Sequence, residues 1–171
     1  VRATYHACDI SNRQALGKRL DGIRAADGPI YAIVHGAGYE RAASFEKKQV
    51  ELVDRTIAAK VDGAAALLEL TARDPLKYFA AFGSVSGRFG GVGQTDYCTA
   101  NEMLAKLVDW HRTIRPECHA AVFHWHAWDD VGMAVRPESK HIAKLHNIRF
   151  MPGREGTRHL LDELLAGLPE R

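Results

Sequence analysis

The sequence predicts an α/β fold in which helices cover both faces of a doubly wound parallel sheet. Short apolar runs alternate along the chain with longer segments whose apolar residues recur at helical spacing. Small or polar residues follow most of the short runs, at the edge of the sheet where such folds bind ligands. With 171 residues, of which 46% are hydrophobic and 26% charged, the chain is expected to form a single domain, 1–171.

The first segments predict a strand, a helix and a second strand. Residues 3–8 form a β-prone run, and Ser11 with Gln14 makes a capping box at the start of a helix over 12–26. The compact apolar run 30–34 then predicts a buried strand.

The middle of the chain repeats this order with longer helices. Apolar residues at helical spacing predict one long helix over 45–72, which ends before the proline of Asp74-Pro75. The run 78–82 predicts the next buried strand. A glycine-rich link follows, and a helix is expected over 95–114.

The C-terminal part predicts one more strand, a lid and a last helix. Residues 119–125 are expected to form the strand. Residues 127–150 mix polar, charged and proline residues without periodicity, so we expect a lid there. In the helix expected over 154–166, four leucines form one face.

Four polar side chains are expected to meet at the carboxyl edge of this sheet. Tyr97 and Asn101 are four positions apart and therefore lie on one face of their helix. Ser84 follows the preceding strand, and Lys60 occupies a helical stripe whose other members are apolar. Taken singly, Ser84 and Asn101 are residues of the kind that cap helices and form turns. Their joint spacing with Tyr97 and Lys60 favours a catalytic set.

Five segments of the chain match a known family in order and spacing. They are CDIS (8–11), VHGAG (34–38), AAKVDGAAAL (58–67), FGSVSGRFGGVGQTDYCTAN (82–101) and WHAWDDVGMA (125–134). Together they resemble the ketoreductase domains of polyketide synthases, within the short-chain dehydrogenase/reductase superfamily, over most of the chain. Most of that superfamily carries a lysine four positions after the tyrosine, whereas here Asn101 stands there and Lys60 takes the place of the asparagine. This exchange is typical of the ketoreductases.

The resemblance implies a Rossmann-like sheet, with this chain as its C-terminal, catalytic portion, and a role for each matching residue. Tyr97 would donate a proton to the substrate ketone and Ser84 would orient that ketone, with Lys60 and Asn101 completing the catalytic set. The cofactor would be NADPH, and the residues expected to bind it are Asp9, Ile10, Gly36, Ala37 and Gly38. The residues expected to bind the substrate are Phe89, Gln94, Trp128 and Met133. Trp128 and Met133 either line the acyl pocket or pack the lid.

A reductase of this kind needs a placed proton donor, because a carbonyl that accepts a hydride becomes an alkoxide. Tyrosine has an ordinary pKa of about 10, and efficient proton transfer favours a value of about 7. A lysine ammonium about 4 Å away contributes on the order of 4 kcal/mol at an effective dielectric constant of about 20. We therefore expect Lys60 to lower the pKa of Tyr97.

Half of the implied cofactor site has no counterpart in the sequence. The chain contains no GxGxxG turn, and its first expected strand matches the third strand of the family's order 3-2-1-4-5-6-7. The first two strands are therefore lacking. We expect the sheet to be completed by an upstream segment of the same synthase or by a second chain.

The implied reaction is the NADPH-dependent reduction of a β-ketoacyl thioester, bound to an acyl carrier protein, to a β-hydroxyacyl thioester. An alternative is a catalytically silent ketoreductase-like module that braces a multidomain synthase. The retained residues weigh against this alternative, because a brace has no need of Lys60 in an apolar stripe. The exchange of lysine and asparagine disfavours a free-standing dehydrogenase of small alcohols.

Composition disfavours several other classes of protein. The net charge is +2 and no basic stripe is interleaved with aromatic residues, so nucleic acid is not an expected partner. No apolar stretch reaches the roughly 18 residues of a membrane span, so no membrane role is expected. The three cysteines are widely spaced and form no CxxC pair, which predicts reduced thiols, no metal site and a cytoplasmic location.

Overall fold

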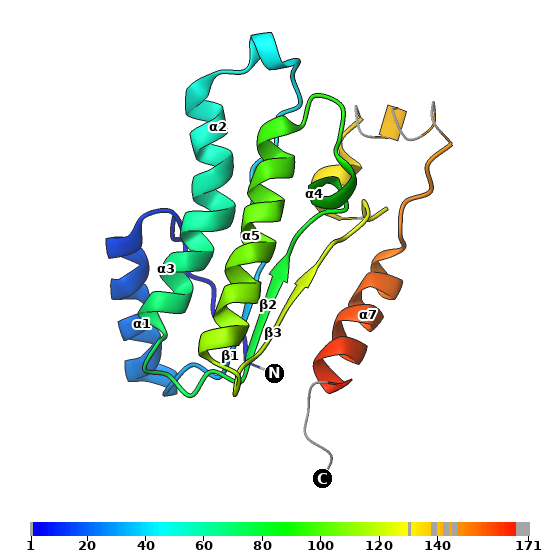
Figure 1. Ribbon diagram of the computed structural model, residues 1–171. Coiled ribbons are helices and arrows are strands. Elements are labelled where there is room, and N and C mark those ends of the chain that lie inside the picture. The colour runs from blue at the N-terminus through cyan, green and yellow to red at the C-terminus, as the bar shows by residue number, and fades with distance from the viewer. Residues whose placement is uncertain (1, 130, 138–139, 142–143, 145–146, 167–171) are drawn as a thin grey trace.

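The computed structural model describes residues 2–129, 131–137, 140–141, 144 and 147–166, and shows a parallel sheet with helices (Figure 1). Its strands are β1 (Ala32–His35), β2 (Tyr78–Phe82) and β3 (His119–Phe123), in the order β1-β2-β3. Ala32 pairs with Tyr78, which pairs in turn with His119. Because the strands are parallel and in register, their carboxyl ends meet at one edge of the sheet.

One face of the sheet is covered by helices that pack side by side (Figure 1). These helices are α1 (Arg13–Asp27), α2 (Val50–Ile57), α3 (Gly63–Leu70) and α5 (Thr95–Ile114). The hydrophobic core lies between them and the strands, where Phe79 of β2 and Leu104 of α5 are 0% exposed. None of the described helices is long and apolar enough to cross a membrane.

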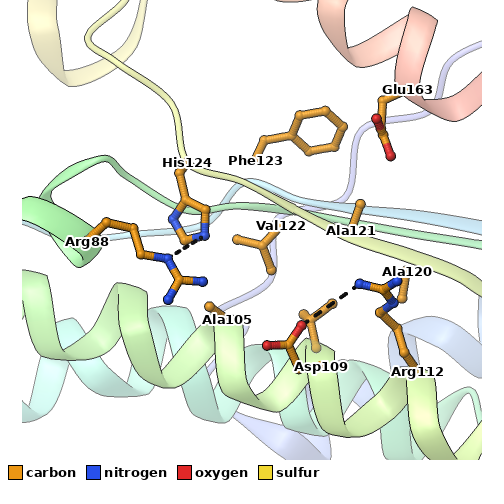
Figure 2. A pocket seen from close by; sticks show the side chains of 11 residues that line it. Arg88, Ala105, Asp109, Arg112, Ala120, Ala121, Val122, Phe123, His124 and Glu163 are labelled. Carbon is orange, nitrogen blue, oxygen red and sulfur yellow. Dashed lines mark hydrogen bonds and ion pairs between the residues drawn. The ribbon is translucent and has the colours of Figure 1, made fainter.

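The other face of the sheet is covered far less. Helix α7 (Gly153–Ala166), which carries Glu163, lies across β3 from α5 (Figure 2). Oε1 of Glu163 is 3.6 Å from Nε2 of His119. Of the leucine face predicted for this helix, Leu161 and Leu165 are 53% and 62% exposed, whereas Leu160 and Leu164 are partly buried. Val34 of β1 alternates with core-facing neighbours and is 54% exposed.

Two expectations for the N-terminal segment are wrong. The run 3–8 forms no strand, because a strand requires a paired neighbour and none of the described residues pairs with it. Helix α1 is capped by Asn12, whose Oδ1 accepts a hydrogen bond from the N–H of Ala15 at 3.0 Å. The Ser11 hydroxyl instead donates to the carboxylate of Asp9.

The unbroken helix predicted over 45–72 is also wrong. Residues Phe45–Lys47 form a separate 3-10 turn, and a π-helical turn, η2 (Ala58–Asp62), separates α2 from α3. A π-helical turn keeps the chain helical while it shifts the hydrogen-bond pattern, so apolar spacing does not reveal it. The glycine-rich link also contains a short helix, α4 (Ser86–Phe89), that the sequence did not predict.

The remaining elements lie close to their predicted positions. Helix α5 and strand β2 have the predicted bounds, β1 is shifted toward the C-terminus, and β3 ends at Phe123. In the expected lid, Trp128 forms a parallel bridge with Met151, and Gly132–Val135 is a 3-10 turn. Residues 130, 138–139, 142–143 and 145–146 of that lid lie outside the described part of the chain.

Replacement of Phe79 tests the position of the core. Phe79→Ala removes a ring that is 0% exposed and is expected to lower the free energy of unfolding by about 3–5 kcal/mol. Phe45→Ala is the matched control, because its ring is 76% exposed, and should change that free energy by less than about 0.5 kcal/mol. Urea denaturation of both variants measures the difference. Equal losses would contradict the assigned core.

Candidate active site

Close backbone contacts bring the expected catalytic residues together at the carboxyl edge of the sheet. A Cβ atom at Gly83 would lie 2.8 Å from Cγ1 of Val122, and one at Gly87 would lie 2.9 Å from Cβ of Asn101. Glycine at both positions therefore allows the segment after β2 to lie against β3 and α5. Ser84 lies between these two glycines in the chain, and its position is therefore fixed by both contacts.

Tyr97 and Asn101 lie in the first turns of α5 and face the interior. Tyr97 is 8% exposed and Asn101 is 0% exposed. Nδ2 of Asn101 donates a hydrogen bond to the backbone carbonyl of Tyr97 at 2.7 Å. Oδ1 of Asn101 is buried and has no hydrogen-bond partner among the described residues. A buried acceptor without a partner is uncommon in folded proteins and marks a position where a water or ligand atom fits.

The hydroxyl of Ser84 supports a turn as an acceptor and can still donate a hydrogen bond. Its Oγ accepts a hydrogen bond from the N–H of Ser86 at 3.2 Å, which supports the start of α4. A hydroxyl that accepts still has its own proton to donate. Ser84 is 9% exposed, so this proton is available to a group that enters the site.

Lys60 enters the same region from the π-helical turn η2. Its side chain is 3% exposed, and Nζ donates a hydrogen bond to the carbonyl of Phe82, at the end of β2, at 2.7 Å. Nζ lies 5.5 Å from the centroid of the Tyr97 ring. Burial lowers the pKa of Lys60 to about 8, because the interior disfavours the charged ammonium.

The expected lowering of the Tyr97 pKa is not found in the structure, where this pKa is raised. Burial raises the pKa of Tyr97, the side chains of Asn101 and Ser84 act in the opposite direction, and the charge of Glu40 adds to the increase. Nζ of Lys60 lies 5.5 Å from the centroid of the tyrosine ring and donates its hydrogen bond to the carbonyl of Phe82, and burial is the largest influence on the pKa of the phenol. Tyr97 therefore holds its proton firmly.

The residues expected to hold the cofactor lie after β1 and before α1, and among them Gly38 is in contact with Lys60. Gly38 passes so close that a Cβ atom would be 3.2 Å from Cε of Lys60, whereas one at Gly36 would have only an ordinary contact. The exposed Asp9 accepts hydrogen bonds from the side chain and the N–H of Ser11, which lower the pKa of its carboxyl and keep it ionised. Ile10 packs against Gly63 at the start of α3.

This arrangement fits the ribose end of a nicotinamide cofactor. An ammonium has three N–H donors, and Nζ of Lys60 has one acceptor among the described residues. Two donors therefore remain for ligand hydroxyls. The small residues at 36–38 leave room for a ligand at the end of β1.

The structure separates the residues expected to bind substrate. Gln94 is near the set, since its Oε1 accepts a hydrogen bond from Ser86 and its Nε2 approaches Glu40. Phe89 is 87% exposed at the end of α4. Trp128 packs against the rings of Phe82 and Trp125. The side chain of Met133 lies outside the described part of the structure.

A buried ion pair beside Tyr97 was not predicted. Asp96, in the first turn of α5, pairs with Lys48, and both side chains are less than 10% exposed. The hydroxyl of Thr56 lies 3.5 Å from the same carboxylate. This cluster fixes the segment before α2 to the helix that carries Tyr97. No spacing rule singles out Lys48, because its partner lies in a distant segment of the chain.

A cavity of about 320 Å³ lies away from these residues, along the outer edge of β3 (Figure 2). It is bounded by α5, β3 and Glu163 of α7. Of its charged side chains, Arg112 pairs with Asp109 inside the lining, and Arg88 pairs with Glu102 outside it. None of the expected catalytic residues lines this cavity. The described residues also contain no group of three or more side chains suited to a metal ion.

Comparison with known proteins decides the family. A family model described as the KR domain matches residues 1–130 of the chain. The chain belongs to the KR domain family. Polyketide synthase GfsB of Streptomyces halstedii is 35% identical over 132 residues, which cover 77% of this chain and 2% of that protein.

Solved ketoreductase structures share the fold of this KR domain. The structure of an A1-type ketoreductase superposes with a TM-score of 0.88 at 30% identity, covering 98% of this chain and 35% of that chain. A ketoreductase domain from the bacillaene assembly line gives a TM-score of 0.85 at 27% identity, covering 97% and 41%. The expected family and the Rossmann-like fold are confirmed. The chain spans less than half of either solved chain and a small part of the synthase.

The lowered pKa of Lys60 predicts an unusual titration. In the folded protein Lys60 should change from the unreactive ammonium to the reactive amine around pH 8, because the pKa is about 8. In the urea-unfolded protein the same lysine should titrate at about 10.4. Trace acetylation with acetic anhydride over a range of pH values, followed at Lys60 by mass spectrometry, measures the pKa of this lysine in the folded and in the unfolded protein. Coincident curves would contradict burial of the ammonium.

Gly38→Ala is expected to displace Lys60. The new Cβ atom would lie 3.2 Å from Cε and 3.5 Å from Nζ, so the side chain must shift by a few tenths of an ångström, which is expected to disturb its hydrogen bond to the carbonyl of Phe82. Loss of that hydrogen bond should change trace acetylation of Lys60 at pH 8 by about tenfold. Gly36→Ala is the control, because its nearest neighbour would be 3.7 Å away. The same change in both variants would argue against this contact.

Proposed function

We propose that this KR domain reduces the β-keto group of an acyl thioester to a hydroxyl group, with NADPH as the cofactor. The observation that carries the proposal is the buried cluster of Tyr97, Asn101, Ser84 and Lys60 at the carboxyl edge of the sheet. This is the edge at which parallel α/β sheets bind ligands. The retained chemistry also separates the domain from a silent brace, which would not need a buried ammonium beside a tyrosine.

Tyr97 would act as the proton donor to the substrate oxygen. Burial raises the pKa of Tyr97, so the phenol is protonated at neutral pH and has a proton to give. The Ser84 hydroxyl would donate a second hydrogen bond to the same oxygen. Both groups are at most 9% exposed, and hydrogen bonds to a developing oxyanion are strong where water is excluded.

Lys60 and Asn101 would support that transfer. The ammonium of Lys60, 5.5 Å from the centroid of the Tyr97 ring, would stabilise the tyrosinate left after proton donation. Its pKa of about 8 lies near neutral pH, which suits a group that returns a proton. Asn101 holds the backbone of Tyr97 and leaves Oδ1 to accept from a water.

The cofactor would be held by residues around the ends of β1 and α1. When bound, it supplies the hydride that no side chain can supply. Asp9 and Ile10 would lie beside the adenine, and 36–38 near the nicotinamide ribose. The free donors of Lys60 would bind ribose hydroxyls.

A covering partner is part of the proposal. An upstream segment of the same synthase, or a second chain, would pair with the free edge of β1 and cover the uncovered face. The exposed side chains of Val34 and Tyr31, at 54% and 56%, support this, because apolar surface on a sheet is stabilised by burial.

An acyl carrier protein would deliver the substrate, as expected for a domain whose relatives are synthases. The free thiols at Cys8, Cys98 and Cys118 support a cytoplasmic location.

Replacement of Tyr97 tests the reaction. With a β-ketoacyl thioester, the full-length protein should consume NADPH, and Tyr97→Phe should slow this at least about 100-fold because the proton donor is lost. Tyr78→Phe is the matched control, since Tyr78 lies in β2 against His119. Loss of NADPH absorbance measures the rate. No consumption by the unmodified protein would support the silent brace instead.

A further inference from the structure

Lys60 reaches the site from a π-helical turn rather than from a regular α-helix. In the turn η2, the N–H of Gly63 bonds the carbonyl of Ala58, five positions earlier. Carbonyls within such a turn no longer meet the donors of an α-helical ladder. Because Lys60 lies in the middle of this turn, the way the turn is held decides the direction of the lysine.

The backbone carbonyl of Lys60 has a partner from outside its own helix. Nε2 of His35 lies 2.9 Å from it, although the two residues are 25 positions apart. A carbonyl oxygen can only accept a hydrogen bond, so Nε2 carries the proton. His35 ends strand β1 and is 1% exposed, so the sheet fixes its ring.

The surroundings of His35 leave the ring neutral. Its other nitrogen, Nδ1, is buried and has no hydrogen-bond partner among the described residues. Burial lowers the pKa of His35, and the charge of Lys60 adds to this, against the hydrogen bond to the carbonyl. The one proton of the ring is therefore used to hold the turn.

We propose that His35 is a positioning residue, whose Nε2–H holds the π-helical turn in the register that directs Lys60 toward Tyr97. The proposal rests on the function proposed above for Lys60. Lys60 is then fixed at both ends, its backbone to β1 through His35 and its ammonium to β2 through the carbonyl of Phe82. Since β1 and β2 pair directly, both anchors belong to one rigid sheet.

Three substitutions separate this role from general packing. His35→Leu fills a similar volume but has no donor, whereas His35→Gln keeps an amide N–H at the reach of Nε2. His111→Leu is the matched control, because His111 is 2% exposed, packs against Phe79 and also has a nitrogen without a partner. His111 lies in α5 and has no contact with Lys60 among the hydrogen bonds of the described residues.

In the full-length protein, His35→Leu is expected to lower kcat on the order of 10- to 100-fold, because a misplaced Lys60 no longer faces Tyr97. Hydrogen exchange of the amides in 58–63, measured by mass spectrometry without cofactor or substrate, should become faster. His35→Gln should restore both quantities to within a few-fold of the unmodified protein, and His111→Leu should leave both unchanged.

Unchanged exchange in 58–63 for His35→Leu, or equal losses in the leucine and glutamine variants, would overturn the proposal. Should His35→Leu fail to fold, His35→Asn replaces it, because its shorter amide does not reach the carbonyl of Lys60. The exchange experiment needs no reaction. Absence of ketone reduction in the unmodified protein would overturn the proposed function, while the exchange data would still decide the role of His35.

Discussion

The burial of the Lys60 ammonium is the constraint on which the site depends. A charged group that is 3% exposed is costly unless acceptors hold it, and here the carbonyl of Phe82 does so. Several features of the chain follow from this contact. Gly38 leaves space for the lysine stem, and the π-helical turn delivers it across the end of the sheet. Substitutions that disturb this one contact therefore disturb the whole edge of the sheet.

Phe82, whose carbonyl accepts the hydrogen bond of Lys60, also belongs to a cluster of aromatic rings. The ring of Phe82 packs edge-on against Trp125, with centroids 5.7 Å apart, and is tilted against Trp128. A Cβ atom at position 156 would collide with the ring of Trp128, so Gly156 allows the start of α7 to lie against this ring. Phe82 thus connects β2 to α7 through the ring of Trp128. A movement of α7 would therefore shift the ring of Trp128 that packs against Phe82.

Local signals in the sequence were enough to predict β2, α5 and α7. Their apolar spacing is set by neighbours in the chain, so local sequence suffices to place them, although Leu161 and Leu165 of α7 remain exposed. The strand over 3–8 failed because pairing depends on a partner strand. The break at Lys60 and the ion pair of Asp96 with Lys48 failed because both are decided by distant segments. Family motifs identified the four-residue set, whereas His35 was recognised only from its contact with a carbonyl.

The half-covered sheet has a consequence for producing these 171 residues without a covering partner. An open strand edge pairs with whichever extended segment reaches it first, including the same edge of another copy. Completion of the sheet by its partner and self-association of the open edges are then competing reactions. The rate of completion does not depend on chain concentration when the partner is covalently linked, whereas the rate of self-association rises with chain concentration. A linked covering segment would therefore act as a built-in chaperone, whose benefit grows with the rate of synthesis.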